Sequence, residues 1–262
     1  MRRAEIRRPG EAPTQHWARA VFRLATAHVG LPAMKTKLII ATVLASILGL
    51  LAAGAASAAF VAIYRNALET TAQRSEVLKL SGRSCTRGGG GTSLKLTVGK
   101  RTEECAYRTP VIGSNLEIAA TGQILEGTPT AVAKKAFLGL QLRAGGGGKL
   151  ELRIFPGQKK AQIAKITKEG IRYLAIEKNI ASLKEAMKPV VLRLRVINGG
   201  GEAANTCTIN GYIAGEAVVE ATEEACNELS GEFTALAAGA PNNGVGLIAG
   251  FKAIVVRAPV NF

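Results

Sequence analysis

The sequence predicts an all-β fold, a two-sheet antiparallel sandwich of the jelly-roll type, preceded by one N-terminal transmembrane or signal helix. Three observations predict it. Apolar and polar residues alternate repeatedly from about residue 93 onward, glycine-rich stretches separate the alternating segments, and one long uncharged stretch precedes them. Alternation places one set of side chains in a core and the other in solvent. Because many strands follow one another without interruption, we expect one domain with two packed sheets.

The N-terminal segments predict an exported protein. Residues 1–37 carry a net charge of +6, and residues 38–64 contain no charged residue. About 20 apolar residues span a bilayer, and basic flanks stay in the cytoplasm. We therefore expect a cytoplasmic segment 1–37, an anchor 38–64, a juxtamembrane helix or stalk 65–79 and an extracytoplasmic β-sandwich 80–262, as in a single-pass bacterial membrane protein.

A cleaved signal peptide is the alternative interpretation of the same residues. Met34 opens a Met-Lys-Thr-Lys stretch, and Ala56-Ser57-Ala58 is a small-x-small cleavage pattern. Translation would then start at Met34, and the protein would be secreted after cleavage near Ala58. We favour the uncleaved anchor because the apolar run continues through Tyr64. Both interpretations export the rest of the chain.

The cysteines predict two disulfides. All four follow the apolar segment, and an even number on the exported side indicates paired thiols. We expect Cys85–Cys105 and Cys207–Cys226, because the partners of each pair are close in sequence. A zinc site is the rival interpretation, but the domain has no Cys-x-x-Cys motif and no histidine.

Six segments show the alternation or apolar content of strands. They are Leu94–Val98, Leu116–Ile118, Phe137–Arg143, Leu150–Ile154, Leu192–Val196 and Ala253–Val256. Glycine runs at Gly88–Gly91, Gly145–Gly148 and Gly199–Gly201 should interrupt strands, and Lys168–Gly170 and Asn210-Gly211 should be hairpin turns. Ile180–Lys188, before Pro189, has a helical pattern. Glu216–Glu228 stays ambiguous, because a glutamate recurs there every four residues.

The order of these elements resembles a known fold superfamily. Asn115–Thr121, Ala136–Arg143, Lys149–Phe155, Gln162–Ile166, Ile171–Ile176, Val190–Val196 and Cys207–Ile213 precede Gly244–Leu247 and Phe251–Val256. This order is similar to that of the concanavalin A-like lectin/glucanase superfamily, particularly its laminin-G-like and sugar-hydrolase-associated modules. The resemblance covers about residues 76–258 and implies a fold, not an activity. The acid that usually follows the closing Phe is Lys252 here.

The composition argues against most catalytic and metal chemistry. The chain contains no Asp, and His16, His28 and Trp17 all precede the apolar segment. The Glu-x-Asp-x-Glu strand of retaining glucanases is therefore missing, and so are the nucleophile systems that need His. We expect no enzyme, no catalytic residue, no metal and no cofactor, with a weak glycoside hydrolase as the least favoured alternative.

Binding to glycan or to an anionic cell-envelope polymer is the leading functional hypothesis. The candidate ligand face consists of four arginines that we expect to point outward from strands, together with the same-face neighbour Glu151 and the ring of Tyr173, for which a half-buried place in the sandwich is the alternative. The arginines are Arg143, Arg153, Arg193 and Arg195. Arginine forks suit phosphates and carboxylates. The alternative for these residues is a solvated face of cross-strand Glu–Arg pairs. The alternative for the domain is a structural or protein-interaction ectodomain. Partners would be the membrane, a glycan or a protein, and not nucleic acid, because no aromatics are interleaved with the basic residues.

Overall fold

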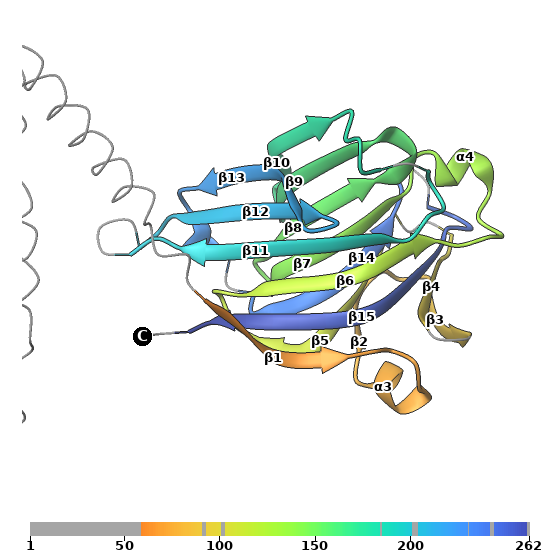
Figure 1. Ribbon diagram of the computed structural model, residues 1–262, viewed down its shortest axis with the longest axis horizontal. Coiled ribbons are helices and arrows are strands. Elements are labelled where there is room, and N and C mark those ends of the chain that lie inside the picture. The colour runs from red at the N-terminus through yellow and green to blue at the C-terminus, as the bar shows by residue number, and fades with distance from the viewer. Residues whose placement is uncertain are drawn as a thin grey trace, which may run out of the picture. The chain divides into compact units, whose positions relative to one another are not determined.

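The computed structural model describes residues 59–90, 93–100, 103–183, 185–200, 204–229, 231–241 and 244–260. More than half of these residues belong to two antiparallel sheets packed face to face, so the predicted sandwich is confirmed. Figure 1 shows β11, β6 and β15 of one sheet in front of β7, β8 and β14 of the other. The predicted N-terminal helix lies outside the described residues.

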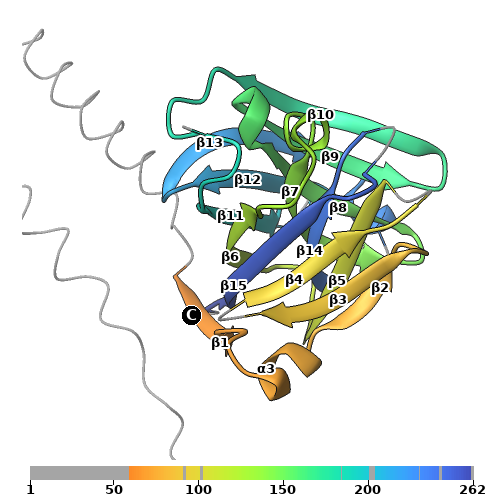
Figure 2. The ribbon, with the colours of Figure 1, turned by 90° about the vertical axis from the view of Figure 1, so that its right-hand side faces the viewer.

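Within the described residues, sheet A has eight strands. In order across the sheet they are β13 (Glu216–Glu223), β12 (Cys207–Ile213), β11 (Val190–Asn198), β6 (Glu117–Ile124), β15 (Ile248–Pro259), β4 (Ser93–Val98) and β3 (Cys85–Gly90), and β1 (Phe60–Asn66) pairs with β15. Figure 2 shows β1 lying along β15.

Sheet B has seven strands in the same described part of the chain. Across the sheet they are β10 (Gly170–Lys178), β9 (Lys160–Thr167), β8 (Gly148–Phe155), β7 (Phe137–Gly145), β14 (Phe233–Gly239), β5 (Glu104–Ile112) and β2 (Leu78–Ser81). The short helices are α3 (Thr71–Ser75), α4 (Thr130–Ala133), η1 (Pro156–Gln158) and η3 (Cys226–Glu228).

The core forms between the sheets from the alternating residues that the sequence indicated. Leu94 and Leu96 of β4, Leu152 of β8, and Leu192 and Leu194 of β11 are all fully buried. The polar residues between them therefore lie on the outer faces, meaning the face of each sheet that is turned away from the other sheet. The six predicted strand segments all lie within strands, apart from Leu116, which immediately precedes β6.

Both predicted disulfides are present. Cys85 of β3 pairs with Cys105 of β5, and Cys207 of β12 pairs with Cys226 of η3, with Cα–Cα distances of 5.7 and 5.9 Å. These separations are ordinary for a disulfide. The first bond joins sheet A to sheet B, and the second fastens the start of β12 to the turn after β13.

The predicted boundary between anchor and domain is wrong. Phe60–Tyr64 lies in β1, which pairs with β15 from Phe60↔Pro259 to Asn66↔Ile254. Tyr64 packs against the core, so these apolar residues belong to the sandwich instead of a span that reaches residue 64. Residues 38–58 lie outside the described part. Among the residues that the structure does describe, no helix has the length and apolarity needed to cross a bilayer.

Residues 65–79 do not form a helical stalk either. Only Thr71–Ser75 is helical, and its start is fixed by a capping box in which Thr70 and Gln73 satisfy each other's backbone N–H groups. The rest belongs to β1, β2 or the loops beside them. Asn66 holds the segment in place because its Nδ2 donates to the Gln73 carbonyl at 2.8 Å and to Glu76 Oε2 at 3.1 Å.

Two local predictions are corrected by packing. Ile180–Lys188 is a turn-rich connection in its described residues and not a helix, because Ile180 and Leu183 are anchored in the core. Asn210-Gly211 lies inside β12, and the hairpin turn is Ala214-Gly215, where both φ angles are positive. Gly211 instead allows close packing, because a Cβ there would lie 2.6 Å from Leu152 Cδ1.

The glycine runs behave in different ways. Gly145–Gly148 forms a turn between β7 and β8, as predicted, and Lys168–Gly170 forms the turn between β9 and β10. Gly88–Gly90, in contrast, is paired within β3 and does not interrupt a strand. Gly244–Leu247 is a turn before β15 instead of a strand, and the first part of the ambiguous stretch, Glu216–Glu223, is β13.

Candidate functional site

The six residues of the predicted ligand face occupy three separate places. Glu151, Arg153 and Tyr173 lie on the outer face of sheet B, and Arg193 and Arg195 lie on the outer face of sheet A. Arg143 lies at one end of the sandwich. The prediction of one continuous cationic face is therefore wrong. The alternation of residues along a strand indicates on which side of its sheet a side chain lies, but it does not indicate to which sheet the strand belongs.

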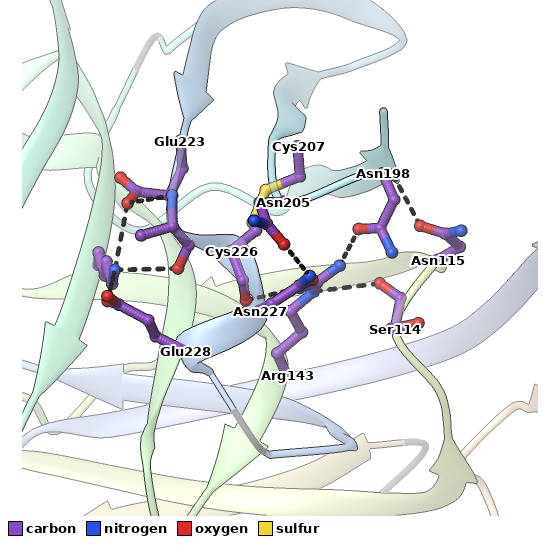
Figure 3. Close-up of a disulfide and its surroundings, with 12 residues drawn as sticks. Ser114, Asn115, Arg143, Asn198, Asn205, Cys207, Glu223, Cys226, Asn227 and Glu228 are labelled. Carbon is purple, nitrogen blue, oxygen red and sulfur yellow. Dashed lines mark hydrogen bonds and ion pairs between the residues drawn. A yellow bond between two sulfur atoms is a disulfide. The ribbon is translucent and has the colours of Figure 1, made fainter. Parts of the chain in front are cut away.

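Arg143 holds the end of the sandwich together and is only 2% exposed. A bulge in β7, with Arg143 at φ 54°, turns the side chain toward elements of sheet A. Its Nη1 donates to the Cys226 carbonyl at 2.7 Å, its Nε donates to the Ser114 carbonyl at 3.3 Å, and it also binds Asn198 (Figure 3). Burial lowers the pKa of this guanidinium. These contacts make Arg143 a structural residue beside the second disulfide.

The outer face of sheet B contains a buried ionic network of Glu104, Gln141, Lys149, Glu151 and Arg153, which we call the carboxylate network. Gln141 Nε2 donates to Glu104 Oε1 at 2.8 Å and to Glu151 Oε1 at 3.0 Å. Arg153 bridges the same two carboxylates, with Nε 2.8 Å from Glu151 Oε2 and Nη2 3.0 Å from Glu104 Oε2. Lys149 pairs with Glu104 and lies 3.8 Å from Glu151.

The network spans four strands because the residues between its members are small. Glu104 lies on β5, two strands away from Gln141 of β7, and on this face the part of β14 between them carries only Ala235, Ala237 and Gly239. Gly139 of β7 leaves room in the same way, because a Cβ there would lie 2.9 Å from Glu151 Oε1. The long side chains of the network can therefore contact one another across these small residues.

The surroundings shift the pKa values of the two carboxyl groups of the network in opposite directions. Burial raises the pKa of Glu104, and the nearby Glu151 charge adds to the rise. Burial alone would also raise the pKa of Glu151, but Lys149 and Arg153 outweigh it and hold that pKa below its ordinary value. Glu104 is therefore the group of this pair that takes up a proton first as the pH falls.

A groove lies next to the carboxylate network, also on the outer face of sheet B. Its volume is ≈ 540 Å³. Polar groups enter it from Gln141, Lys149 and Lys168, and apolar surface comes from Leu80, Ile166 and Phe233. Its floor and rim come from five different strands of sheet B and the turn after β9. We call it the sheet B groove.

Gln141 contributes an unpaired acceptor. Its Nε2 faces two carboxylates, which only accept hydrogen bonds, so the amide orientation is fixed. Oε1 then points away from them. Among buried side-chain N and O atoms of the residues that the structure describes, it is the one without a hydrogen-bond partner. A buried acceptor is costly when unsatisfied and indicates a place for a donor.

Sheet A carries a different constellation, the arginine cluster of Arg193, Arg195 and Arg257 around Glu117. The Glu117 carboxylate is 1% exposed. It accepts from Arg195 Nε at 2.7 Å and from Arg257 Nη1 at 2.6 Å, and Arg193 Nη1 lies 3.8 Å away. These are the cross-strand Glu–Arg pairs that the sequence allowed as an alternative. The three guanidinium groups remain partly exposed.

Aromatic rings extend the arginine cluster on both sides. The Arg193 guanidinium lies 3.8 Å from the centre of the Tyr212 ring, and the Arg195 guanidinium lies 4.5 Å from the centre of the Phe60 ring. Such contacts hold an arginine in place without neutralising it. The cluster therefore keeps a net positive charge.

Sequence reasoning missed most of the sheet B site. Lys149 could have been found, because Lys149, Glu151 and Arg153 alternate along one strand and share a face. Glu104 and Gln141 could not, because their neighbours in space come from strands far away in sequence. Tyr173 is 49% exposed on the edge strand β10, on the same outer face. No three His, Cys, Asp or Glu residues in the described ranges come together as a metal-binding group.

No protein-family model and no curated protein sequence matches this chain. Solved structures do share its architecture. A protein of unknown function with a galectin-like fold from Bacillus subtilis has a TM-score of 0.56 and 12% identity, covering 78% of this chain and 100% of that chain. The carbohydrate binding module CBM66 from Bacillus subtilis has a TM-score of 0.50 and 12% identity, covering 70% and 96%.

A third similar structure is the Bacillus licheniformis beta-glucanase, with a TM-score of 0.50 and 12% identity, covering 75% of this chain and 98% of that chain. The fold is similar to the concanavalin A-like jelly roll. The resemblance that the strand order indicated is therefore confirmed at the level of fold. At 12% identity, this likeness carries no information about which residues bind or react.

Proposed function

We propose that the β-sandwich is a non-catalytic module that binds glycan or an anionic cell-envelope polymer in the sheet B groove. We also propose that the uncharged segment 38–58 places the module outside the cytoplasm, as a membrane anchor or as a cleaved signal peptide. The observation that carries the binding proposal is the buried, unpaired Oε1 of Gln141. Gln141 lines the groove, so a small shift of its side chain would let a sugar hydroxyl donate a hydrogen bond to this oxygen.

The composition of the groove suits a sugar polymer. Sugars present hydroxyl groups around their rim and C–H groups on their ring faces, so they need polar groups beside an apolar surface. Gln141 supplies a polar group, and Ile166 and Phe233 supply apolar surface. Lys168 adds positive charge, which favours uronic acids or phosphate-bearing polymers over neutral ones. The fold shared with a carbohydrate binding module supports the same proposal.

The two carboxylates of the network do not support hydrolysis. A retaining glycosidase needs one carboxylate that is free to attack and a second group that exchanges a proton with the substrate. Glu151 is fully buried and Glu104 is nearly so, both are engaged by Arg153 and Lys149, and neither lines the groove. We therefore propose binding without turnover, and incubation with the bound polymer should release no reducing ends.

The proposal is tested by retention of the protein on immobilised polygalacturonate, an acidic polymer, and on a neutral glucan. Lys168→Ala, in an exposed turn, should weaken retention on the acidic polymer roughly three- to tenfold, because one cation of the groove is lost. Gln141→Met should weaken binding to both polymers, because the buried acceptor is removed. Lys135→Ala is the matched control, an exposed lysine that does not line the groove. Equal retention of Lys168→Ala and Lys135→Ala on the acidic polymer would exclude the groove.

A further inference from the structure

The outer face of sheet A is strongly basic. Six of its residues are cations, and the strand register places them on this face along β11, β15, β4 and β1. They are Arg65, Lys95, Arg193, Arg195, Lys252 and Arg257. The acidic residues that the register of the described strands places there are Glu117, which is already engaged by the arginine cluster, and Glu220. The face therefore has a net positive charge over five neighbouring strands.

The chain enters the domain at one end of this face. β1 begins at Phe60, whose ring contacts Arg195, and the next outward residue of β1, Ala62, is paired with Arg257. The uncharged apolar segment of the sequence runs directly into this strand, without an intervening polar spacer. If residues 38–57 cross a bilayer as about 20 helical residues, the path from Ala58 to Phe60 is at most roughly 7 Å.

With such an anchor, this short connection would keep the start of β1 close to the bilayer. Successive residues of a strand are about 3.3 Å apart, so the arginine cluster would then lie within roughly 15 Å of the headgroups. The Debye length at physiological salt is about 8 Å, so the nearest cations of the face lie within one or two Debye lengths of the lipid charges. Anionic headgroups would then attract them.

We propose that the outer face of sheet A docks on the surface of the bilayer that anchors the chain, through anionic phospholipid headgroups. This inference rests on the anchor of the proposed function and is independent of glycan binding. Docking turns the outer face of sheet B, with its groove, away from the membrane, because the two outer faces point in opposite directions. The groove is then presented to polymers outside the bilayer.

The test uses the full chain in nanodiscs and measures energy transfer from a single tryptophan to dansyl-labelled headgroups. Trp17, the only tryptophan, is replaced by Phe. A new tryptophan is placed either on sheet A, as Val191→Trp, or on sheet B, as Tyr173→Trp. The two positions are matched, because Val191 is 50% and Tyr173 is 49% exposed. Nanodiscs contain phosphatidylcholine alone or an equal mixture with phosphatidylglycerol.

With phosphatidylglycerol present, Val191→Trp should show at least about twofold higher transfer than Tyr173→Trp. The difference should fall severalfold when Arg65→Glu and Lys252→Glu are combined, because two exposed cations of the face are reversed. The matched control reverses Lys135 and Lys178, which changes the net charge by the same amount away from sheet A. Raising the salt concentration should also reduce the difference.

Equal transfer from the two positions in phosphatidylglycerol would overturn docking, and so would a difference that persists unchanged in pure phosphatidylcholine. Displacement by added polygalacturonate at physiological salt would assign the face to an acidic polymer instead. Failure of the chain to enter nanodiscs would overturn the anchor and the docking together. Retention of the same preparation on immobilised polymer, measured without lipid, shows separately whether the groove binds glycan.

Discussion

Buried charges in this domain are held by partners on more than one strand. Lys165 of β9 donates to Glu223 of β13 at 3.1 Å and to Glu228 at 2.9 Å, and Glu223 also binds Arg172 (Figure 3 shows both glutamates). Burial by itself would raise the pKa of Glu223, but the hydrogen bonds from Lys165 and the Ala225 N–H lower it below its ordinary value. Such residues connect the two sheets electrostatically, as Leu and Ile connect them by packing.

Glu223→Gln should destabilise the domain by about 2 kcal/mol at neutral pH, because it leaves Lys165 without its buried partner. Since the folded pKa of Glu223 is lowered, its contribution is present above the ordinary value of 4.5 and is lost as the pH falls through the folded pKa. Urea unfolding of both proteins at pH 7, 5 and 3 measures this. Glu228→Gln, at a side chain that is 70% exposed, is the control and should cost under about 0.5 kcal/mol. A deficit for Glu223→Gln that grows toward pH 3 would contradict the assignment.

At the scale of strands, glycine has two different roles within one hairpin. Gly215 has φ 92° and forms the turn between β12 and β13. Gly211 lies within β12 beside a bulge, where a side chain would meet Leu152 of sheet B and Val219 of β13. An Asn-Gly pair is ordinarily the stronger turn signal, but here the inter-sheet packing of Gly211 decides its place.

Gly211→Ala should destabilise the domain by about 1–3 kcal/mol, because its Cβ would lie 2.6 Å from Leu152 Cδ1 and 2.7 Å from Val219 Cγ1. Equilibrium unfolding in urea checks this. Gly200→Ala, where an added Cβ meets nothing within 4 Å, should leave the free energy of unfolding within about 0.5 kcal/mol of the original. A Gly211→Ala variant as stable as Gly200→Ala would mean that β12 has room to shift.

At the scale of the whole domain, the two outer faces differ in charge and in shape. Sheet B carries the groove and a carboxylate network whose charges balance, whereas sheet A carries an excess of cations. The Cys85–Cys105 bond joins the sheets near β3, which is an edge strand of sheet A. The described residues, from Ala59 onward, form a compact unit with its own core.

Removing the bond between the sheets with Cys85→Ser and Cys105→Ser should lower the free energy of unfolding by about 3 kcal/mol, as expected for a loop of about 20 residues. Thermal and urea unfolding of the oxidised proteins measure the loss. The reduced original protein is the control and should lose at least as much, because both of its disulfides are opened. An unchanged midpoint for the double variant would show that packing alone holds β3 against sheet B.

The sequence alone determined many of the strands of the domain, the pairing of the cysteines and the two-sheet sandwich architecture, but it missed β1, β2, β3, β5 and β14. Each of these depends on local information, namely the alternation of side chains along one strand and the short spacing between paired thiols. The alternation along one strand also placed Arg153 next to Glu151 on the same face. Local sequence signals indicated some of the hairpin turns as well. The anchor remains a prediction from the sequence, shortened at its end because Phe60–Tyr64 pairs with β15.

Only the tertiary structure decided which strands share a sheet, and therefore which polar residues meet. Arg153 and Arg195 both lie in strands where charged and apolar residues alternate, yet they lie on the outer faces of different sheets. Glu104 reaches Lys149 only because the strand between β5 and β7 carries alanines, and Gln141 keeps an unpaired oxygen only because two carboxylates hold its amide. These contacts are non-local, and the physical reason is that hydrogen bonding between strands brings together residues far apart along the chain.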